Sequence, residues 1–162
     1  MSGADVVVRP ARADEADLLT GLALRSKAHW GYHEDFMAAC RDELTVPATA
    51  CESGHVLVGE LVGEVYGEVA GGVLGFSRIE PAGDVVELVA LFVEPSAIGS
   101  GLGRLLMDAA VDQAKALGAA RIELDADPYA EPFYARMGCV PIGESPSHSI
   151  PGRSLPRMAL DF

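Results

Sequence analysis

The sequence predicts a single α/β domain over residues 1–162, in which helices flank a central sheet. Strand-like and helix-like patterns succeed one another in the order β-α-α-β-β-β-α-β-α-β-β. A chain of 162 residues that is 49% hydrophobic and 22% charged is large enough to bury one stable core. No stretch has the composition of an interdomain linker, so we expect the whole chain to fold as one unit.

The first half of the chain is expected to hold three strands and two helices. Residues 6–11 are apolar and predict the first strand. Apolar side chains recur at helical spacing from Leu18 to Leu22 and again from Phe36 to Leu44, which predicts two helices. Glycines at every fourth position from 59 to 67 disfavour a further helix, so we expect a long hairpin that turns near Gly71 and Gly72.

The second half is expected to begin with a strand that is buried on both faces, because residues 85–93 form a nearly continuous apolar run. An amphipathic helix should follow from Leu102 to Leu117, with Gly118 as its stop. The remaining elements are a strand closed by Pro128, a short helix ended by Gly138, and two last strands.

A glycine-rich turn joins the buried strand to the amphipathic helix. Gly99, Gly101 and Gly103 leave the free amide groups of the helix N-terminus accessible, and Arg104 adds a positive charge. This arrangement predicts a site for an anion such as a phosphate, with a tight turn and no ligand as the alternative. The turn lacks the Lys-Ser or Lys-Thr of a P-loop and the glycine spacing of a dinucleotide fingerprint.

Two motifs resemble signatures of the GNAT superfamily of acyl-CoA-dependent N-acyltransferases. Val93-Glu94-Pro95, followed by Gly101 and Gly103, is similar to the family's cofactor-binding signature, in which a strand ends in Val-x-Pro before Arg/Gln-x-x-Gly-x-Gly/Ala. Residues 126–138, ADPYAEPFYARMG, are similar to the second signature. Ile98 stands where the family usually has Arg or Gln, which should weaken pyrophosphate binding without abolishing it.

The resemblance implies a mixed, mostly antiparallel sheet and the transfer of an acetyl group from acetyl-CoA to a primary amine by direct attack. It places the pyrophosphate on the turn and the pantetheine against the preceding strand, where an N–H near Leu91 or Phe92 would stabilise the developing oxyanion. The cofactor-binding residues that it implies are Leu91, Phe92, Val93, Ile98, Gly99, Ser100, Gly101, Leu102, Gly103, Arg104, Asp127 and Phe133. For Asp127, a role in capping the next helix is the alternative.

Two catalytic roles follow from the resemblance. Glu87 matches a glutamate that acts as general base in several members, and a charge in an apolar strand independently suggests a polar cavity or an ion pair. A solvated strand end is the alternative, and His33, Glu34 and His148 are rival bases. Tyr134 matches the tyrosine that protonates the thiolate, with a core aromatic as the alternative.

The acceptor is expected to contact the two N-terminal helices and the last loop between strands. The candidate residues are Trp30, His33, Glu34, His148 and Arg153. We expect a small-molecule amine; the alternatives are a peptide N-terminus or lysine as acceptor, a non-catalytic acyl-CoA sensor, and a nucleotide-binding protein.

Composition and sequence pattern limit the classes of partner that the protein can bind and indicate where in the cell it acts. A net charge of −12 argues against binding to nucleic acid or to anionic membranes. No segment reads as a signal peptide or membrane span, and the three cysteines share no metal-ligand spacing. We therefore expect a cytoplasmic protein without a metal, and a homodimer is the assembly to test because dimers are common for this fold.

Overall fold

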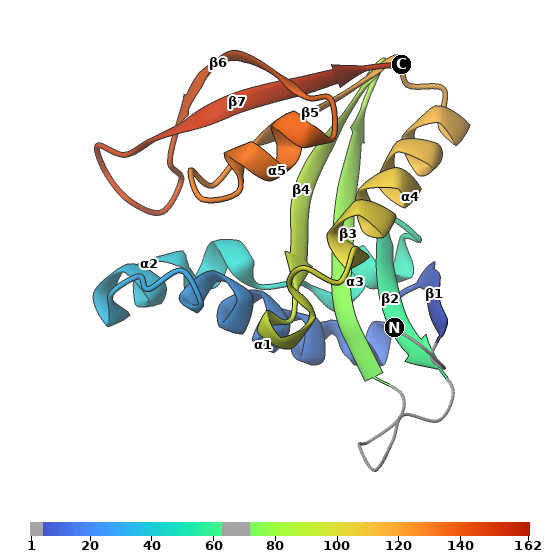
Figure 1. The fold of residues 1–162 in the computed structure, drawn as a ribbon, viewed down its shortest axis with the longest axis horizontal. Coiled ribbons are helices and arrows are strands. Elements are labelled where there is room, and N and C mark those ends of the chain that lie inside the picture. Colours follow the sequence, from blue (N-terminus) through green and yellow to red (C-terminus); the bar gives the residue numbers. More distant parts are fainter. Residues whose placement is uncertain (1–4, 63–71) are drawn as a thin grey trace.

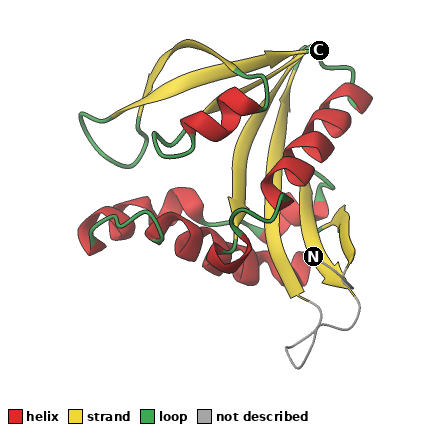
Figure 2. Ribbon diagram, in the orientation of Figure 1, coloured by secondary structure: helices red, strands yellow, loops and turns green. Residues whose placement is uncertain are grey.

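The computed structural model describes residues 5–62 and 72–162, which form one seven-stranded sheet with helices on both faces (Figures 1 and 2). The strand order is β1-β2-β3-β4-β5-β7-β6, and every neighbouring pair is antiparallel except β4 and β5. The strands are β1 (Asp5–Pro10), β2 (Val56–Val62), β3 (Gly72–Ala82), β4 (Val85–Val93), β5 (Arg121–Asp125), β6 (Val140–Pro146) and β7 (Ser154–Asp161). The predicted fold class, a mixed and mostly antiparallel sheet flanked by helices, is confirmed.

The helices divide between the two faces of the sheet. The first face carries α1 (Ala16–Ala28), α2 (Glu34–Leu44) and α3 (Ala48–Glu52), and the second carries α4 (Leu102–Ala116) and α5 (Glu131–Arg136). Two short 3-10 turns, η1 (Ala13–Glu15) and η2 (Pro95–Ala97), precede α1 and α4. The sequence pattern did not predict α3, because five residues are too few to show a helical period.

Each face has its own hydrophobic core. On the first face, Leu19 and Leu22 of α1 pack with Phe76 of β3, and all three are fully buried. On the second face, Met107 of α4 and Ile122 of β5 lie in a cluster that also includes buried Tyr134. The alternation of side chains along a strand produces this division, because neighbouring residues point to opposite faces.

The predicted hairpin is present, because β2 and β3 pair in antiparallel fashion. Gly72 lies opposite Leu61 in this pairing, so it begins β3 and is not part of the turn. Gly71 and the repeated glycines at 63 and 67 lie outside the described residues.

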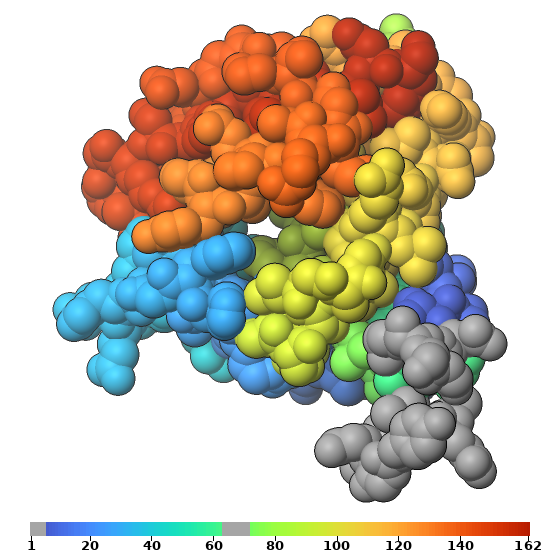
Figure 3. Space-filling view, viewed as in Figure 1, coloured from blue at the N-terminus to red at the C-terminus, as the bar shows by residue number. Residues whose placement is uncertain are grey.

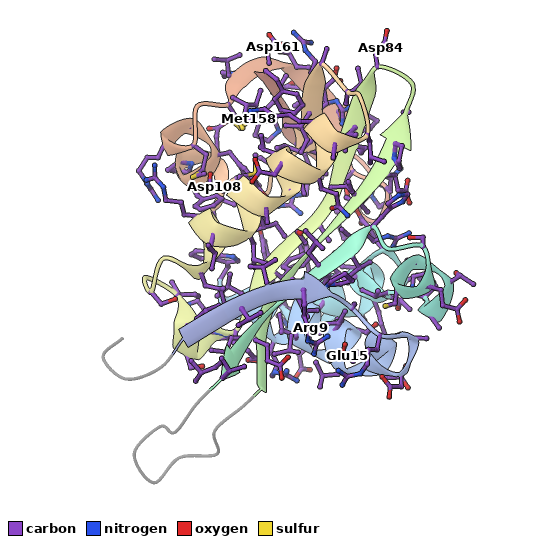
Figure 4. The ribbon with its side chains drawn as sticks, turned by 90° about the vertical axis from the view of Figure 1, so that its right-hand side faces the viewer. Arg9, Glu15, Asp84, Asp108, Met158 and Asp161 are labelled. Atoms are coloured by element: carbon purple, nitrogen blue, oxygen red, sulfur yellow. The ribbon has the colours of Figure 1, made fainter. Side chains whose placement is uncertain are left out.

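An ion pair ties the first strand to the start of the helical layer. Arg9 of β1 binds the carboxylate of Glu15 in η1 through two hydrogen bonds of 2.9 Å, and the two side chains lie together in Figure 4. Arg9 also binds Glu60 of β2 at 2.5 Å.

The sheet opens between β4 and β5. These two strands pair only from Val85 to Glu87, opposite Arg121 to Glu123, and then separate (Figure 1). A bulge on β4 places Val89 between the residues that pair with Ile79 and Arg78 of β3. Bulges of this kind bend a strand and are common beside active sites. Beyond Glu87, β4 therefore has an edge with no neighbouring strand.

Candidate active site

A cavity of about 980 Å³ fills the space that opens between β4 and β5. The space-filling view shows the hollow among the N-terminal helices, the segment before α4 and the segment around α5 (Figure 3). Its lining includes residues of β4 from Glu87 to Val93, residues of the glycine-rich turn, and residues of α1, α2 and α5. The strand, the glycine-rich turn and the short helix that the sequence indicated as functional therefore line one cavity.

The backbone of β4 offers two residues to this cavity. The N–H of Glu94 donates to the carbonyl of Leu74 on β3 at 2.7 Å. Backbone groups along a strand point alternately to its two edges, so Phe92 also faces β3 while Leu91 and Val93 face the open edge. Leu91 and Val93 can therefore pair with an extended ligand as a further strand would. The same alternation makes Leu91, rather than Phe92, the residue whose N–H points into the cavity.

The turn before α4 presents backbone N–H groups at the other end of the cavity. Gly101 has a φ of 91°, which L side chains rarely adopt, so this bend needs glycine. The backbone N–H groups of Gly99, Gly101, Gly103 and Arg104 form no hydrogen bond within the described part of the chain. Together with the helix dipole, these groups form a site suited to an anion.

Ser100 and Leu102 play a structural part in the same turn. The N–H of Leu102 donates to Oγ of Ser100 at 3.3 Å, and the Leu102 side chain is buried in the core. Neither residue lines the cavity, although the resemblance named both as cofactor-binding.

Side chains add positive charge near these amides. Arg104 and Arg136 both line the cavity, both are exposed, and neither forms an ion pair with a described residue. Ile98, before the glycines, also lines the cavity and is 46% exposed. The turn and the first turn of α4 therefore combine free amides and Arg104 with an apolar side chain where a polar contact is usual, and Arg136 of α5 adds a second positive charge to the cavity lining.

Gly103 allows α4 to approach α5 closely. A Cβ at this position would lie 3.2 Å from the ring of Phe133, which is tighter than an ordinary contact. Phe133 in turn lines the cavity and packs edge-on against Tyr134, with ring centroids 5.1 Å apart.

Tyr134 lines the cavity and is 7% exposed. Its hydroxyl forms no hydrogen bond with any described residue. Burial raises the pKa of Tyr134, and the nearby Cys139 and Asp127 raise it further. The phenol therefore stays protonated at neutral pH, which is the state that a proton donor requires.

Glu87 is held in an ion pair at the point where β4 and β5 separate. Arg157 of β7 donates to its two carboxylate oxygens, Nη1 to Oε2 at 2.8 Å and Nη2 to Oε1 at 2.6 Å. Glu87 also lines the cavity. The sequence suggested that a charge in this apolar strand would face a polar cavity or form an ion pair, and Glu87 does both.

Asp127 joins the N-terminal helices to the turn between β5 and α5. It accepts hydrogen bonds from Lys27 Nζ at 2.9 Å, from the Tyr32 hydroxyl at 2.8 Å and from the Tyr129 N–H at 2.9 Å. Burial alone would raise the pKa of Asp127, but Lys27 and the other donors outweigh burial and hold it below its usual range. The bond to Tyr129 belongs to the turn that precedes α5, so the predicted alternative of a local capping role also has a contact.

The residues expected to contact the acceptor fall into two groups. Trp30 and His148 line the cavity. Arg153 does not, but its Nη2 donates to the Tyr32 hydroxyl at 2.9 Å and so belongs to the contacts around Asp127. His33 and Glu34 lie at the start of α2 away from the cavity lining, where the His33 ring accepts the N–H of Asp35 at 3.2 Å.

The comparison with known protein families decides the assignment. Residues 23–139, well over half of the chain, match the acetyltransferase (GNAT) family. The chain belongs to this family. A comparison with curated proteins found no match.

Solved structures with the GNAT fold resemble this protein over almost its whole length. A GCN5-related N-acetyltransferase from Rhodopseudomonas palustris is 24% identical, with a TM-score of 0.70 over 100% of this chain and 99% of that one. The PaiA N-acetyltransferase from Thermoplasma acidophilum, solved with coenzyme A, is 15% identical, with a TM-score of 0.69 over 98% and 99% of the two chains. YncA from Salmonella typhimurium, described as a putative acetyltransferase and solved with acetyl-CoA, is 20% identical, with a TM-score of 0.64 over 97% and 94%. At these identities the likeness concerns the fold.

Several residues of this GNAT site were not found from the sequence. Arg157, Lys27 and Arg136 have ordinary surface-like surroundings in the sequence, and only the fold brings them to the cavity. The bulge at Val89 gave no sequence signal either. Within residues 5–62 and 72–162, no group of His, Cys, Asp or Glu is arranged to hold a metal ion, and no helix is long and apolar enough to cross a membrane.

Proposed function

We propose that this GNAT protein transfers an acetyl group from acetyl-CoA to the primary amine of a small molecule. The observation that carries the proposal is the open edge of β4, which continues within one cavity into the free amide groups before α4. Such an edge suits an extended chain that can pair with backbone, and such amides suit the phosphates at the end of that chain.

The residues of the cavity fit the parts of acetyl-CoA. The N–H groups of Gly99, Gly101, Gly103 and Arg104 would hold the pyrophosphate, and Arg136 adds positive charge to the lining of the same cavity. Leu91 and Val93 would pair with the amides of the pantetheine. Bound acetyl-CoA supplies an acetyl group activated as a thioester, and the protein must orient it and move protons around it.

Three groups then share the chemistry. The N–H of Leu91 faces the cavity and would donate to the thioester oxygen, where negative charge develops during attack. The protonated hydroxyl of Tyr134 would donate a proton to the departing sulfur. Both oxygens of Glu87 already accept from Arg157, so Glu87 would take the proton of the amine through a water molecule.

The contacts around Asp127 support a small acceptor over a protein. Lys27 of α1 and Tyr32, which lies between α1 and α2, bind Asp127, and Trp30 stacks on Tyr129 with ring centroids 5.3 Å apart. This bridge joins the two walls of the cavity and limits the space available to a folded partner.

The proposal is tested in two steps. Calorimetry with acetyl-CoA, coenzyme A, NAD and ATP measures which ligand binds, and we expect the two coenzyme A species to bind most tightly. Thiol release is then measured against a panel of small amines, free amino acids, and peptides with free N-termini or lysines. Turnover confined to small amines supports the proposal.

Other outcomes would contradict specific parts of it. Faster turnover of peptides would favour a protein acceptor. Binding of acetyl-CoA without turnover of any amine would favour a non-catalytic sensor, for which the apolar Ile98 and the competing candidates for the general base are the motivating features. Tighter binding of NAD or ATP would contradict the assignment of the anion site.

A further inference from the structure

Arg157 connects three carboxylates on one face of the sheet. Glu87 lies opposite Glu123 in the pairing of β4 with β5, and Asp125 lies opposite Arg157 in the pairing of β5 with β7. Glu123 and Asp125 are two residues apart on one strand, so their side chains share a face. Ile122 and Leu124 point to the opposite face and are buried against α4 and α5. The four charged residues therefore lie on the face away from α4.

The guanidinium of Arg157 makes four hydrogen bonds to these acids. Besides its two bonds to Glu87, Nη1 donates to Asp125 at 3.0 Å and Nη2 donates to Glu123 at 3.0 Å. The side chain of Arg157 is 23% exposed, and those of the three acids are 20–31% exposed. The three carboxylates together raise the pKa of Arg157, so it remains fully charged.

This geometry fixes the Glu87 carboxylate more firmly than charge alone would. A planar guanidinium that donates two parallel N–H bonds sets both the position and the rotation of a carboxylate. Without Arg157, three negative charges would face one another at the separation of β4 and β5, and Glu80 of β3, opposite Glu87 in the pairing, would add a fourth nearby. Glu87 would then turn away from its neighbours.

We infer that Arg157 is a positioning residue for the acetyl transfer, which holds the Glu87 carboxylate in the orientation needed to accept a proton through water. The inference rests on the proposed function and assigns a role to a residue of the cavity lining that acts through another side chain. Arg157 acts through Glu87, so its contribution exists only while Glu87 is present.

The test is a double-mutant cycle on kcat, with thiol release as the assay. Glu87→Gln and Arg157→Gln should each lower kcat by roughly a hundredfold or more, the lower range of a lost acid–base contribution. In the Glu87→Gln background, Arg157→Gln should lower kcat by no more than about twofold, because residues that act as a unit are non-additive. The KM for acetyl-CoA should stay within about twofold of the wild-type value in every variant.

Two further variants separate positioning from charge and from folding. Arg157→Lys keeps the charge but cannot donate two parallel bonds, so it should restore the melting temperature without restoring kcat. Arg121→Gln is the matched control. Arg121 lies on the same face and pairs with Asp161 and Glu123, but it has no contact with Glu87, and its loss should leave kcat unchanged.

Each contrary result has a distinct meaning. Full kcat in Arg157→Gln or Arg157→Lys, or losses that multiply in the double variant, would overturn the positioning role while leaving acetyl transfer in place. Absence of thiol release by the wild-type protein with every amine would overturn the proposed function, and the inference with it.

Discussion

Tyr134, the proposed proton donor, is a side chain that burial keeps in its protonated form. Desolvation disfavours the phenolate and keeps the proton on the hydroxyl, while the absence of a hydrogen-bond partner within the described residues leaves that proton free to be donated. A phenol that served only the core would gain stability from a buried acceptor. A hydroxyl in a cavity wall, without a partner among the described residues, is consistent with the proposed role of Tyr134 as proton donor.

Replacing Tyr134 with Phe tests this explanation. The ring and its contact with Phe133 are kept, so we expect an unchanged fold and an unchanged affinity for coenzyme A. The value of kcat should fall by ~10²–10⁴-fold, as expected when a general acid is removed. Steady-state thiol release and calorimetry measure the two quantities. An unchanged kcat would show that Tyr134 is a packing residue and that the thiolate leaves without its help.

Ile98 is the residue at which the anion site departs from the usual family pattern. Its side chain lines the cavity and is 46% exposed, so an arginine there has room to reach a phosphate. We expect Ile98→Arg to tighten coenzyme A binding by roughly threefold to tenfold, which corresponds to about 1 kcal/mol. Calorimetry at two salt concentrations measures the gain, which should shrink as salt rises.

A second added charge controls for the general field of the turn. Leu105 is 40% exposed in the first turn of α4 but does not line the cavity. Leu105→Arg adds the same charge without the contact and should change the affinity by less than about twofold. Equal gains in the two variants would mean that the effect of Ile98→Arg is long-range attraction and no direct contact.

At the scale of elements, hydrophobic periodicity and glycine positions in the sequence predicted the strands and helices that depend on local interactions. The continuous apolar run of β4 and the glycines before α4 follow from burial and backbone conformation, so their positions were readable from the sequence. The site needed more, because Glu87 meets Arg157 across 70 positions of the chain and Lys27 meets Asp127 across 100. No periodicity records such a pairing. The sequence therefore indicated that Glu87 needs a partner, while only the packing of β4, β5 and β7 identifies it.

The junction of β1 with η1 should make stability depend on pH in the acid range. Hydrogen bonds from Arg9, against the opposing effect of burial, lower the pKa of Glu15 to about 2 from its ordinary value of 4.5. A carboxyl group with a depressed folded-state pKa stabilises the protein above its unfolded pKa and loses that contribution as pH falls. The contribution, on the order of 3 kcal/mol at neutral pH, should therefore disappear between about pH 4.5 and pH 2.

Glu15→Gln isolates this contribution. Urea unfolding at pH 7 should give a lower free energy of unfolding for Glu15→Gln than for the wild-type protein, and this difference should decrease steadily below about pH 4.5. Asp14→Asn is the matched control, because the neighbouring Asp14 side chain is 78% exposed and its pairing with Arg12 is loose, at 3.4 Å. A difference for Glu15→Gln that stays constant with pH would contradict the assigned ion pair.

The whole molecule is held together at the site in two ways. The paired ends of β4 and β5 connect the two halves of the sheet, and the contacts of Lys27, Trp30 and Tyr32 with Asp127 and Tyr129 connect the halves again across the cavity. Between these two connections, β4 and β5 do not pair with each other. The separation that the cavity requires is thus maintained by contacts on both sides of it.

Lys27→Met should loosen the second connection, and Trp30 reports on it because it is the single tryptophan of the chain. Without Lys27, Asp127 keeps a half-buried charge with less compensation, and the stacking of Trp30 on Tyr129 should weaken. We expect Trp30 emission to shift to longer wavelength, acrylamide quenching to rise, and the KM for the amine to rise more than kcat falls. In the wild-type protein the same emission shift should occur only in acid, as pH falls through the lowered pKa of Asp127, because the charge that holds Lys27 is then lost.

The control variant is Lys115→Met, at the end of α4 and far along the chain from these contacts, which should change none of these signals. Identical quenching of Trp30 in Lys27→Met and in the wild-type protein would mean that the aromatic stack alone maintains the second connection.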